Sequence, residues 1–317
     1  MIVPERRELY PDPDGSMHLD KEIMMVQTNT LPARTLTIAG SDSGGGAGIQ
    51  ADLKTFFSLG TFGMSAITAV TAQNTQGVSG VYPLPIEAVV RQIDDVVSDI
   101  GVDAAKTGML FSAPIVEAVS DRVHVHKLTR LVVDPVMIAK GGAPLLEDSA
   151  IEAYMKTLLP RTLIITPNIP EAERLTGIEL ARDDDRRARA RAARMLFEAG
   201  TRYVVIKGGH DRGPVVEDLY YDGTRWVVFK KKRQQTAHTH GTGCTFSAAI
   251  TAFLALGHEP FEAILLAESY IDAAIRSALP LGHGHGPTNH WAYGVKRPEQ
   301  TLSDAPNPDV TWEEIDP

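Results

Sequence analysis

The chain has 317 residues, of which 43% are hydrophobic and 22% are charged, values typical of a globular protein. Its formal net charge of -9 disfavours binding to nucleic acid or anionic lipid through overall charge. The single cysteine, Cys244, excludes an intramolecular disulfide and fits a reducing compartment. No apolar run approaches the roughly 18 residues that span a membrane. The polar N-terminus lacks the apolar region of a secretory signal, so we expect a cytoplasmic protein.

Two peripheral segments flank a long central region. Residues 1–33 carry several prolines and little apolar periodicity, which predicts a flexible N-terminal arm. Residues 291–317 carry further prolines among acidic residues and are expected to form a C-terminal tail. Residues 34–290 form the expected domain between them. Within it, the basic run at residues 230–233 is interpreted as the solvated end of a strand.

Strand and helix signals alternate along the central region. A hairpin signal, Asp222-Gly223, lies between two β-rich runs near its end and predicts an antiparallel edge pair. The alternation before it predicts βαβ units, a mainly parallel sheet and a three-layer α/β/α domain. Strands are predicted at residues 35–39, 66–70, 103–107, 130–134, 163–166, 203–207, 215–220 and 226–231. Helices are predicted at residues 48–59, 85–100, 112–124, 148–159, 184–199, 243–256 and 260–278.

Ligands of such sheets bind at the carboxyl ends of the strands, so the residues that follow each strand are the candidates for a site. The glycine-rich run 40–48 leads into a helix whose N-terminus favours an anion. It lacks the features of a Walker A loop or of a dinucleotide site. Asp52 either faces the cleft or is an ordinary acid that complements the helix dipole. The amides of Gln73 and Asn74 suit a ring with donors and acceptors, or simply a turn.

Three later strand ends carry further candidates. Met109 is either a core residue or an apolar wall of a pocket. Asp134 is placed to influence Mg²⁺ or phosphate, although turn formation alone also explains it. The loop after it, which contains Lys140, suits a mobile flap over a ligand. Lys207 closes the sixth strand, where its charge and the bare backbone of Gly208-Gly209 can meet nucleotide phosphates.

Asn168 and Glu171 follow the fifth strand and have the spacing of a capping box at the start of a helix. In that arrangement each side chain bonds the backbone N–H of the other residue. The same oxygens also suit the water shell of Mg²⁺. The spacing alone favours the cap.

The run at residues 238–249 is the most informative part of the chain. Glycines and a threonine lead directly into an apolar, alanine-rich helix, so the unpaired amides at its start form an anion site. Cys244 lies in the first turn, where we expect a lowered thiol pKa and a role as base or nucleophile. A capped helix with a structural cysteine is the plain alternative. A zinc site with His238 and His240 is a weaker one, since their spacing is unusual for zinc ligands.

Taken together, these stretches resemble the hydroxymethylpyrimidine/phosphomethylpyrimidine kinases of thiamine biosynthesis, within the ribokinase superfamily. The resemblance implies a ribokinase-like fold and two successive transfers from ATP, with Mg²⁺. The first is to 4-amino-5-hydroxymethyl-2-methylpyrimidine and the second to its monophosphate. It also implies a homodimer. The matching stretches run in family order at residues 39–54, 72–75, 106–110, 134–137, 166–171, 207–210 and 240–245.

The resemblance also implies roles for individual residues. Cys244 matches the base that takes the proton of the hydroxymethyl group, so it should matter less in the second transfer. The substrate ring is expected among Gly40, Asp52, Gln73, Met109 and Val136. The transferred phosphoryl group is expected at the amides of Gly241, Thr242, Gly243 and Cys244. Asn168 and Glu171 match the motif that organises Mg²⁺, near Asp134, and Lys207 and Gly209 belong to the nucleotide side.

Three other functions remain open at this point. Pyridoxal and pyridoxine kinases share the fold and, in one branch, the cysteine; Gln73 favours the pyrimidine enzyme without excluding dual use. A catalytically idle, pyrimidine-binding regulatory protein is the second alternative, and the presence of Asn168, Glu171 and Cys244 argues against it. A nicotinamide-dependent dehydrogenase rests on the glycine-rich turn alone. No nucleic acid or membrane partner is expected.

Overall fold

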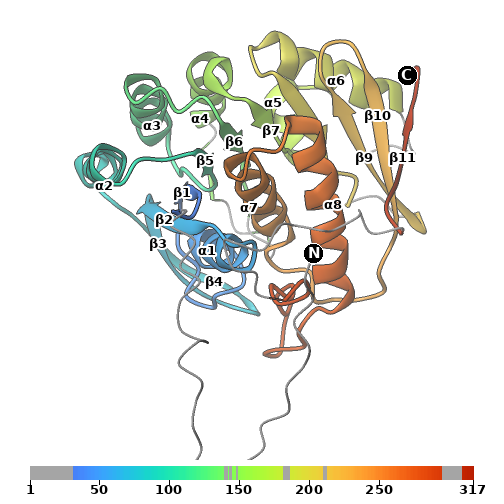
Figure 1. Ribbon diagram of the computed structural model, residues 1–317, viewed down its shortest axis with the longest axis horizontal. Helices are drawn as coiled ribbons and strands as arrows, with labels where there is room; N and C mark the ends of the chain where they lie inside the picture. Colours follow the sequence, from blue (N-terminus) through green and yellow to red (C-terminus); the bar gives the residue numbers. More distant parts are fainter. Residues whose placement is uncertain are drawn as a thin grey trace, which may run out of the picture. The chain divides into compact units, whose positions relative to one another are not determined.

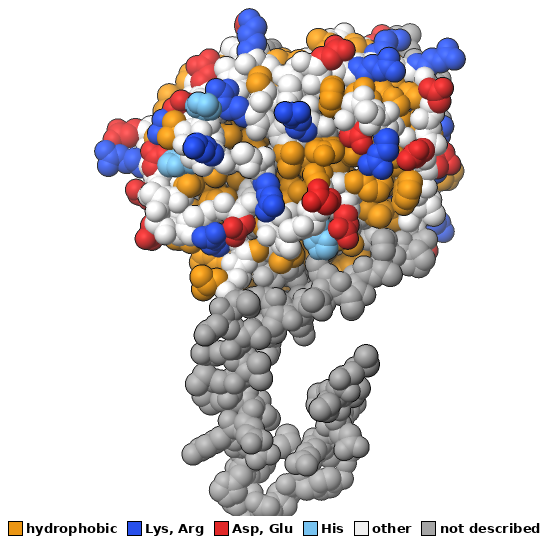
Figure 2. Space-filling view, turned by 45° about the horizontal axis from the view of Figure 1, so that its top comes forward, with side chains coloured by type: hydrophobic (Ala, Val, Ile, Leu, Met, Phe, Trp, Pro, Cys, Tyr) orange, Lys and Arg blue, Asp and Glu red, His pale blue; other side chains and the backbone are white. Residues whose placement is uncertain are grey.

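The computed structural model describes residues 31–138, 142, 145–147, 149–180, 186–209, 213–294 and 309–317. The expected arm at residues 1–33 lies almost wholly outside them, as does Lys140 of the expected flap. Among the described residues, no helix combines the length and the apolar character that crossing a membrane requires. Figure 2 shows acidic and basic side chains interspersed over the face that it presents, so that face has no extended region of one sign.

A nine-stranded sheet forms the centre of the domain (Figure 1), in the order β11-β10-β9-β8-β7-β6-β5-β1-β2. From β2 to β8 all neighbours pair in parallel, and β8, β9, β10 and β11 pair antiparallel. The predicted parallel sheet and its hairpin are confirmed. The strands are β1 (Arg34–Ala39), β2 (Phe62–Ile67), β5 (Ala104–Thr107), β6 (Leu131–Val133), β7 (Ile164–Ile165), β8 (Tyr203–Ile206), β9 (Val215–Tyr221), β10 (Trp226–Lys232) and β11 (Thr311–Glu314).

Helices cover both faces of this sheet and complete the three predicted layers (Figure 1). Helix α7, whose first turn contains the cysteine, is apolar almost all round because it is buried between the sheet and its neighbours. One face carries α1 (Gly48–Ser58), α7 (Thr242–Ala255) and α8 (Pro260–Arg276). The other carries α2 (Ile86–Asp99), α3 (Ala113–Val125), α4 (Ala150–Ala153), the π-helix η2 (Tyr154–Leu158), the 3-10 helix η3 (Leu159–Arg161), α5 (Ile169–Thr176) and α6 (Arg186–Glu198).

The strand predicted at residues 66–70 is wrong, because the structure has two strands there. β2 ends at Ile67, and β3 (Ala69–Asn74) leaves the main sheet to pair antiparallel with β4 (Gly77–Pro83). Thr68 between them is buried, and its hydroxyl donates to the Met109 carbonyl at 2.6 Å. The hydroxyl of Ser43, in the glycine-rich turn, bonds the backbone of Gln73 at 2.7 and 2.8 Å. The break therefore carries Gln73 over the end of β1.

Strand β11 lies within the expected C-terminal tail. It pairs with β10, and Lys230 Nζ lies 2.6 Å from a carboxylate oxygen of Glu313. The Trp312 ring meets Phe261 edge-on at 5.5 Å between centroids. The last residues of the chain thus cover the outer strand of the hairpin, which the sequence analysis did not predict.

The basic run at residues 230–233 is a solvated strand end only in part: Lys232 is exposed, but Lys231 points inward and is only 9% exposed. Its ammonium group lies 2.7 Å from Asp218 and also contacts Glu268. The other oxygen of Asp218 accepts from the Gly208 N–H at 2.6 Å, which ties the cluster to the turn after β8. Burial, reinforced by Asp218 and opposed by Lys231, raises the pKa of Glu268 to about 8.

This cluster predicts a specific pH dependence of stability. The pKa of Glu268 is higher in the folded chain than its ordinary value of 4.5, so its contribution is complete at low pH and is lost as the pH rises towards 8. Between pH 5 and 8, Glu268→Gln should lose less unfolding free energy than the wild type, by about 1 to 3 kcal/mol. Urea unfolding of both proteins at each pH measures this difference. Parallel curves for the two proteins would contradict it.

Candidate active site

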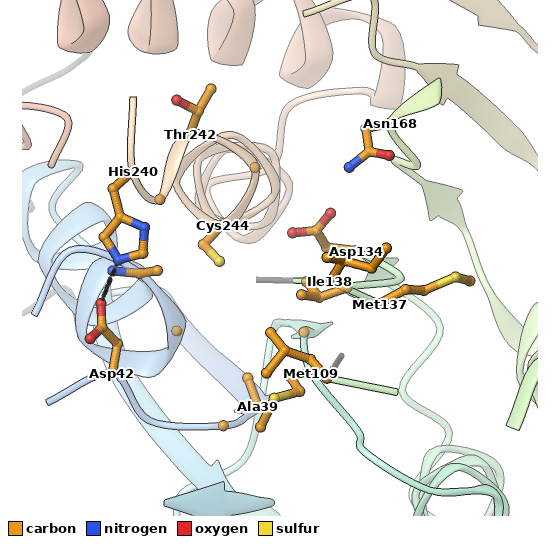
Figure 3. A pocket seen from close by; sticks show the side chains of 18 of the residues that line it. Ala39, Asp42, Met109, Asp134, Met137, Ile138, Asn168, His240, Thr242 and Cys244 are labelled. Atoms are coloured by element: carbon orange, nitrogen blue, oxygen red, sulfur yellow. Dashed lines mark hydrogen bonds and ion pairs between the residues drawn. The ribbon is translucent and has the colours of Figure 1, made fainter. Parts of the chain in front are cut away.

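A cavity of about 540 Å³ lies at the carboxyl ends of β1, β5, β6, β7 and β8, beside the starts of α1 and α7 (Figure 3). Gly209 does not line it, and its carbonyl instead accepts from Arg233 at 2.8 Å. Asn74 does not line it either, and Lys140 lies outside the described residues. The other predicted site residues line this cavity: Gly40, Asp52, Gln73, Met109, Asp134, Val136, Asn168, Glu171, Lys207, Gly241, Thr242, Gly243 and Cys244.

The glycine-rich turn after β1 is organised by Asp42. Its carboxylate accepts from the backbone N–H groups of Gly44 at 2.8 Å, Gly46 at 3.0 Å and Ala47 at 2.8 Å. The ring of His240 lies 2.9 Å from the same carboxylate. Burial opposes ionisation, but these hydrogen bonds hold the pKa of Asp42 below its ordinary value. Asp42 is therefore a carboxylate that fixes the turn and reaches across to the His240 segment.

The start of α7 presents unpaired backbone donors to the cavity. Gly241 precedes it in the left-handed conformation (φ 80°), and a Cβ there would lie 1.7 Å from the Gly46 carbonyl oxygen. Only glycine therefore allows this close approach of the two turns. Among the described residues, none accepts a hydrogen bond from the N–H groups of Gly241, Gly243 and Cys244. Unpaired amides and a helix dipole are what an anion site requires, and the binding of an anion at this point stays a prediction.

Asp52 forms a fully buried ion pair with Lys106, with 2.8 Å between the charged atoms and no exposure of either side chain. Its second oxygen accepts from the Thr37 hydroxyl at 2.6 Å. The first turn of α1 contains no acidic residue, so the alternative interpretation of Asp52 as a dipole-complementing acid is wrong. The positive charge of Lys106 lies close enough to Cys244 to act on its thiol.

The predicted lowering of the Cys244 pKa is wrong for this structure. The thiol faces the cavity (Figure 3), but burial raises its pKa to about 12. Lys106 and the backbone N–H of Gly48 favour the thiolate, while the carboxylates of Asp52 and Asp134 disfavour it. The helix dipole acts in the expected direction but is outweighed. In the unliganded protein, Cys244 is thus a neutral thiol at pH 7.

Because Cys244 is the only cysteine, its ionisation can be measured on the whole protein. Only the thiolate reacts with iodoacetamide. With a pKa of about 12, the alkylation rate should still rise roughly tenfold per pH unit between pH 7.5 and 10. A rate that levels off below pH 9 would show that the pKa is not raised.

A second ion pair lies on the other side of the α7 start. Lys207 Nζ is 2.9 Å from one oxygen of Asp134, and the other oxygen is buried without a hydrogen-bond partner among the described residues. A Cβ on Gly243 would lie 3.1 Å from Lys207 Nζ, so this pair borders the start of α7 directly. A lysine beside free amides stabilises an anion, and the unpartnered oxygen leaves room for a cation or its water.

The capping box predicted at Asn168 and Glu171 is confirmed. The Asn168 side chain accepts from the Glu171 N–H at 2.9 Å, and Glu171 accepts from the Asn168 N–H at 2.8 Å. Burial and Asp134 raise the pKa of Glu171 to about 7, against the attraction of Lys207. Among the described residues, no three His, Cys, Asp or Glu side chains gather to hold a metal ion, so the zinc alternative has no ligand set there.

The phosphomethylpyrimidine kinase family matches residues 42–289 of this chain. A hydroxymethylpyrimidine/phosphomethylpyrimidine kinase of Bacillus subtilis is 51% identical over 261 residues, which cover 82% of this chain and 95% of that relative. A kinase of the same name from Haemophilus influenzae is 51% identical over 265 residues, covering 82% and 97%. The chain belongs to the phosphomethylpyrimidine kinase family.

Solved structures of vitamin kinases share the fold of this family member. A phosphomethylpyrimidine kinase of Clostridium difficile is 45% identical, with a TM-score of 0.67 over 76% of this chain and 99% of the other. A pyridoxal kinase of Staphylococcus aureus, in complex with AMP-PCP and pyridoxal, is 37% identical, with a TM-score of 0.79 over 90% and 100%. The ribokinase-like fold implied by the sequence is confirmed.

The sequence analysis did not anticipate the roles of three residues of this kinase site, Asp42, Lys106 and His240, of which only His240 was considered, as a zinc ligand. All three stand in the stretches that carried the resemblance, so their positions were visible. Their roles were not, because each depends on a partner far away in the chain.

Met109 satisfies both of its predicted interpretations, since it lines the cavity and packs in a small buried cluster with Ala69 and Leu145.

Proposed function

We propose that the protein phosphorylates 4-amino-5-hydroxymethyl-2-methylpyrimidine with ATP, and then phosphorylates the resulting monophosphate, as a step of thiamine biosynthesis. Membership of the phosphomethylpyrimidine kinase family supports this reaction. The observation that carries it is the set of free amides of Gly241, Gly243 and Cys244, which face a cavity beside the Lys207–Asp134 pair. Phosphoryl transfer needs this kind of fixed charge stabilisation more than covalent chemistry.

The first transfer moves one proton and one phosphoryl group. The alcohol oxygen forms a bond to the γ-phosphorus, the bond from that phosphorus to the bridging oxygen breaks, and ADP leaves with the electron pair. The alcohol proton goes to the sulfur of Cys244. Since the unliganded thiol has a pKa of about 12, only a small fraction is thiolate at pH 7, and the alcohol step should accelerate as the pH rises.

The second transfer has no alcohol proton to remove. The attacking oxygen belongs to the phosphate of the monophosphate, which is already ionised at neutral pH. In this step the protein contributes the amides at the start of α7 and the charge of Lys207, which stabilise the negative charge on the transferred phosphoryl group. Gly40, Gln73, Met109 and Val136, with the buried Asp52, form the wall at which we place the pyrimidine ring.

ATP is the phosphoryl donor in this proposal, and it binds together with Mg²⁺. Asp134 fits Mg²⁺ because one of its oxygens is buried and has no hydrogen-bond partner in the part of the chain that the structure describes. Glu171, which shares that corner of the cavity, would act through the water around the ion, and Asn168 would hold Glu171 through the cap. When bound, Mg²⁺ neutralises charge on the phosphates. Lys207 and Gly209 would lie on the nucleotide side, Gly209 outside the cavity wall.

Turnover on three substrates tests the proposal: the hydroxymethylpyrimidine, its monophosphate and pyridoxal, each with ATP and Mg²⁺. We expect the highest kcat/KM on the two pyrimidines. Pyridoxal is the relevant competitor because the Staphylococcus aureus pyridoxal kinase shares the fold over nearly the whole chain. A preference for pyridoxal would replace the proposed substrate, and no ATP consumption with any of the three would favour a regulatory protein. The homodimer and the cytoplasmic location remain predictions.

A further inference from the structure

Three side chains that line the cavity, Asp42, Gln73 and His240, meet beside the start of α7. Nε2 of His240 lies 2.9 Å from an oxygen of Asp42 (Figure 3) and 3.2 Å from the side-chain amide of Gln73. His240 is 8% exposed and Asp42 2%. Both Gln73 and His240 line the cavity, and Gly241 of the anion site follows His240 directly in the chain. One ring nitrogen is therefore shared between a carboxylate and the amide that faces the substrate.

The position of the hydrogen on this ring follows from its neighbours. A carboxylate only accepts hydrogen bonds, and the pKa of Asp42 is lowered, so Nε2 of His240 must carry a hydrogen and donate it. The opposite tautomer would set a nitrogen lone pair against a buried negative charge. With Nε2 as donor, the group of Gln73 that faces the ring has to be an acceptor, which is the amide oxygen.

The other end of the Gln73 amide leads to the same orientation. The Thr71 hydroxyl donates to the Ser41 carbonyl at 2.8 Å, so its hydrogen is committed. Its oxygen, which lies 3.3 Å from Oε1 of Gln73 as the amide is placed, can then only accept. A rotation of the Gln73 amide by half a turn about its last side-chain bond exchanges the oxygen and the NH₂ group. The oxygen then accepts from His240 and the NH₂ group donates to Thr71, so both residues have a suitable hydrogen-bond partner.

The parts that impose this orientation are held rigidly. Asp42 is fixed by three backbone N–H groups of the glycine-rich turn. The backbone N–H of His240 donates to the Gly286 carbonyl at 3.1 Å, and its carbonyl accepts from Thr288 at 3.2 Å. Turning the ring over would put a carbon atom in place of Nε2 beside Asp42 and lose that hydrogen bond, so the polarity of the amide is built into the fold.

We propose that Asp42 and His240 are a positioning pair that sets the hydrogen-bonding polarity of Gln73 and thereby selects the heterocycle. One N–H of Gln73 bonds Thr71, and the second is left as a donor towards the cavity. The substrate must then bring an acceptor to this point, such as an unprotonated ring nitrogen. The proposal rests on the proposed function, which places Gln73 beside the substrate ring. It adds the two residues that decide whether Gln73 donates to that ring or accepts from it.

Binding of the hydroxymethylpyrimidine by calorimetry tests this, since the readout does not require turnover. His240→Met removes the donor, and His240→Gln keeps an N–H near the same place as a matched control. We expect His240→Met to raise Kd about 10-fold to 100-fold, and His240→Gln to raise it less than about fivefold. In kinetics, KM for the pyrimidine should rise by a larger factor than kcat falls, with KM for ATP unchanged.

A double-mutant cycle shows whether His240 acts through Gln73. In the Gln73→Ala background, His240→Met should add less than about threefold to Kd. Multiplicative effects, or equal losses for His240→Met and His240→Gln, would overturn the proposal. If His240→Met does not fold, Asp42→Asn serves the same comparison, again against Gln73→Ala. Wild-type protein that binds the pyrimidine but does not phosphorylate it would refute the proposed function and leave this inference standing.

Discussion

Cys244→Ser is expected to lower kcat on the hydroxymethylpyrimidine by roughly 10²-fold to 10³-fold, while kcat on its monophosphate falls less than about tenfold. The reason is that only the alcohol has a proton to lose, and a serine hydroxyl is a far weaker base than a thiolate. The amides of Gly241 and Gly243 are untouched by the change, so KM for ATP should stay within about twofold. Separate assays that start from the alcohol and from the monophosphate measure the two effects.

Cys244→Ala is the matched control for this prediction. It removes the base but keeps a small side chain in the first turn of α7, so it should behave like the serine variant on both substrates. Equal losses on the alcohol and on the monophosphate would show that Cys244 shapes the site and does not take the proton. Undiminished turnover on the alcohol would remove the base assignment altogether.

The second large effect concerns stability. Lys106→Met leaves the Asp52 carboxylate without its counter-ion at a position with no exposure. We expect it to lower the free energy of unfolding by about 3 to 5 kcal/mol, because an unpaired buried charge keeps its full desolvation cost. Urea unfolding measures the loss. The same variant should raise the pKa of Cys244 further, since Lys106 is the charge that favours its thiolate.

The double variant Asp52→Asn/Lys106→Met separates the charge from the packing. It leaves no unpaired charge, so it should recover at least half of the loss seen with Lys106→Met alone. A double variant as unstable as the sum of the two single variants would show that Lys106 stabilises the fold through packing, not through its pairing with Asp52.

The central sheet could be predicted from the sequence because its signals are local. Each parallel strand is a short β-rich run, and each covering helix has its own period, so both can be recognised without knowledge of their partners. The features that were missed are two strand pairings, which depend on segments outside the strand itself. Nothing local at Thr68 indicates that β3 leaves the sheet to pair with β4. The acidic, proline-bearing tail likewise gives no sign that β11 pairs with β10.

The site was predictable to the extent that its residues follow strands. That rule placed Asp134, Asn168, Lys207 and the start of α7 at one cavity. It did not give the electrostatics, because these depend on contacts between distant segments. The prediction of a lowered pKa for Cys244 took into account only the dipole of the helix that contains it. Burial and two carboxylates brought in by α1 and by the end of β6 decide the direction instead.

Mass spectrometry of the product formed from 4-amino-5-hydroxymethyl-2-methylpyrimidine with excess ATP and Mg²⁺ tests the central claim most directly. Two successive transfers in one cavity predict that the monophosphate appears first and is then converted to the diphosphate. Accumulation of the monophosphate alone, with no diphosphate even after prolonged incubation, would contradict the two-step assignment.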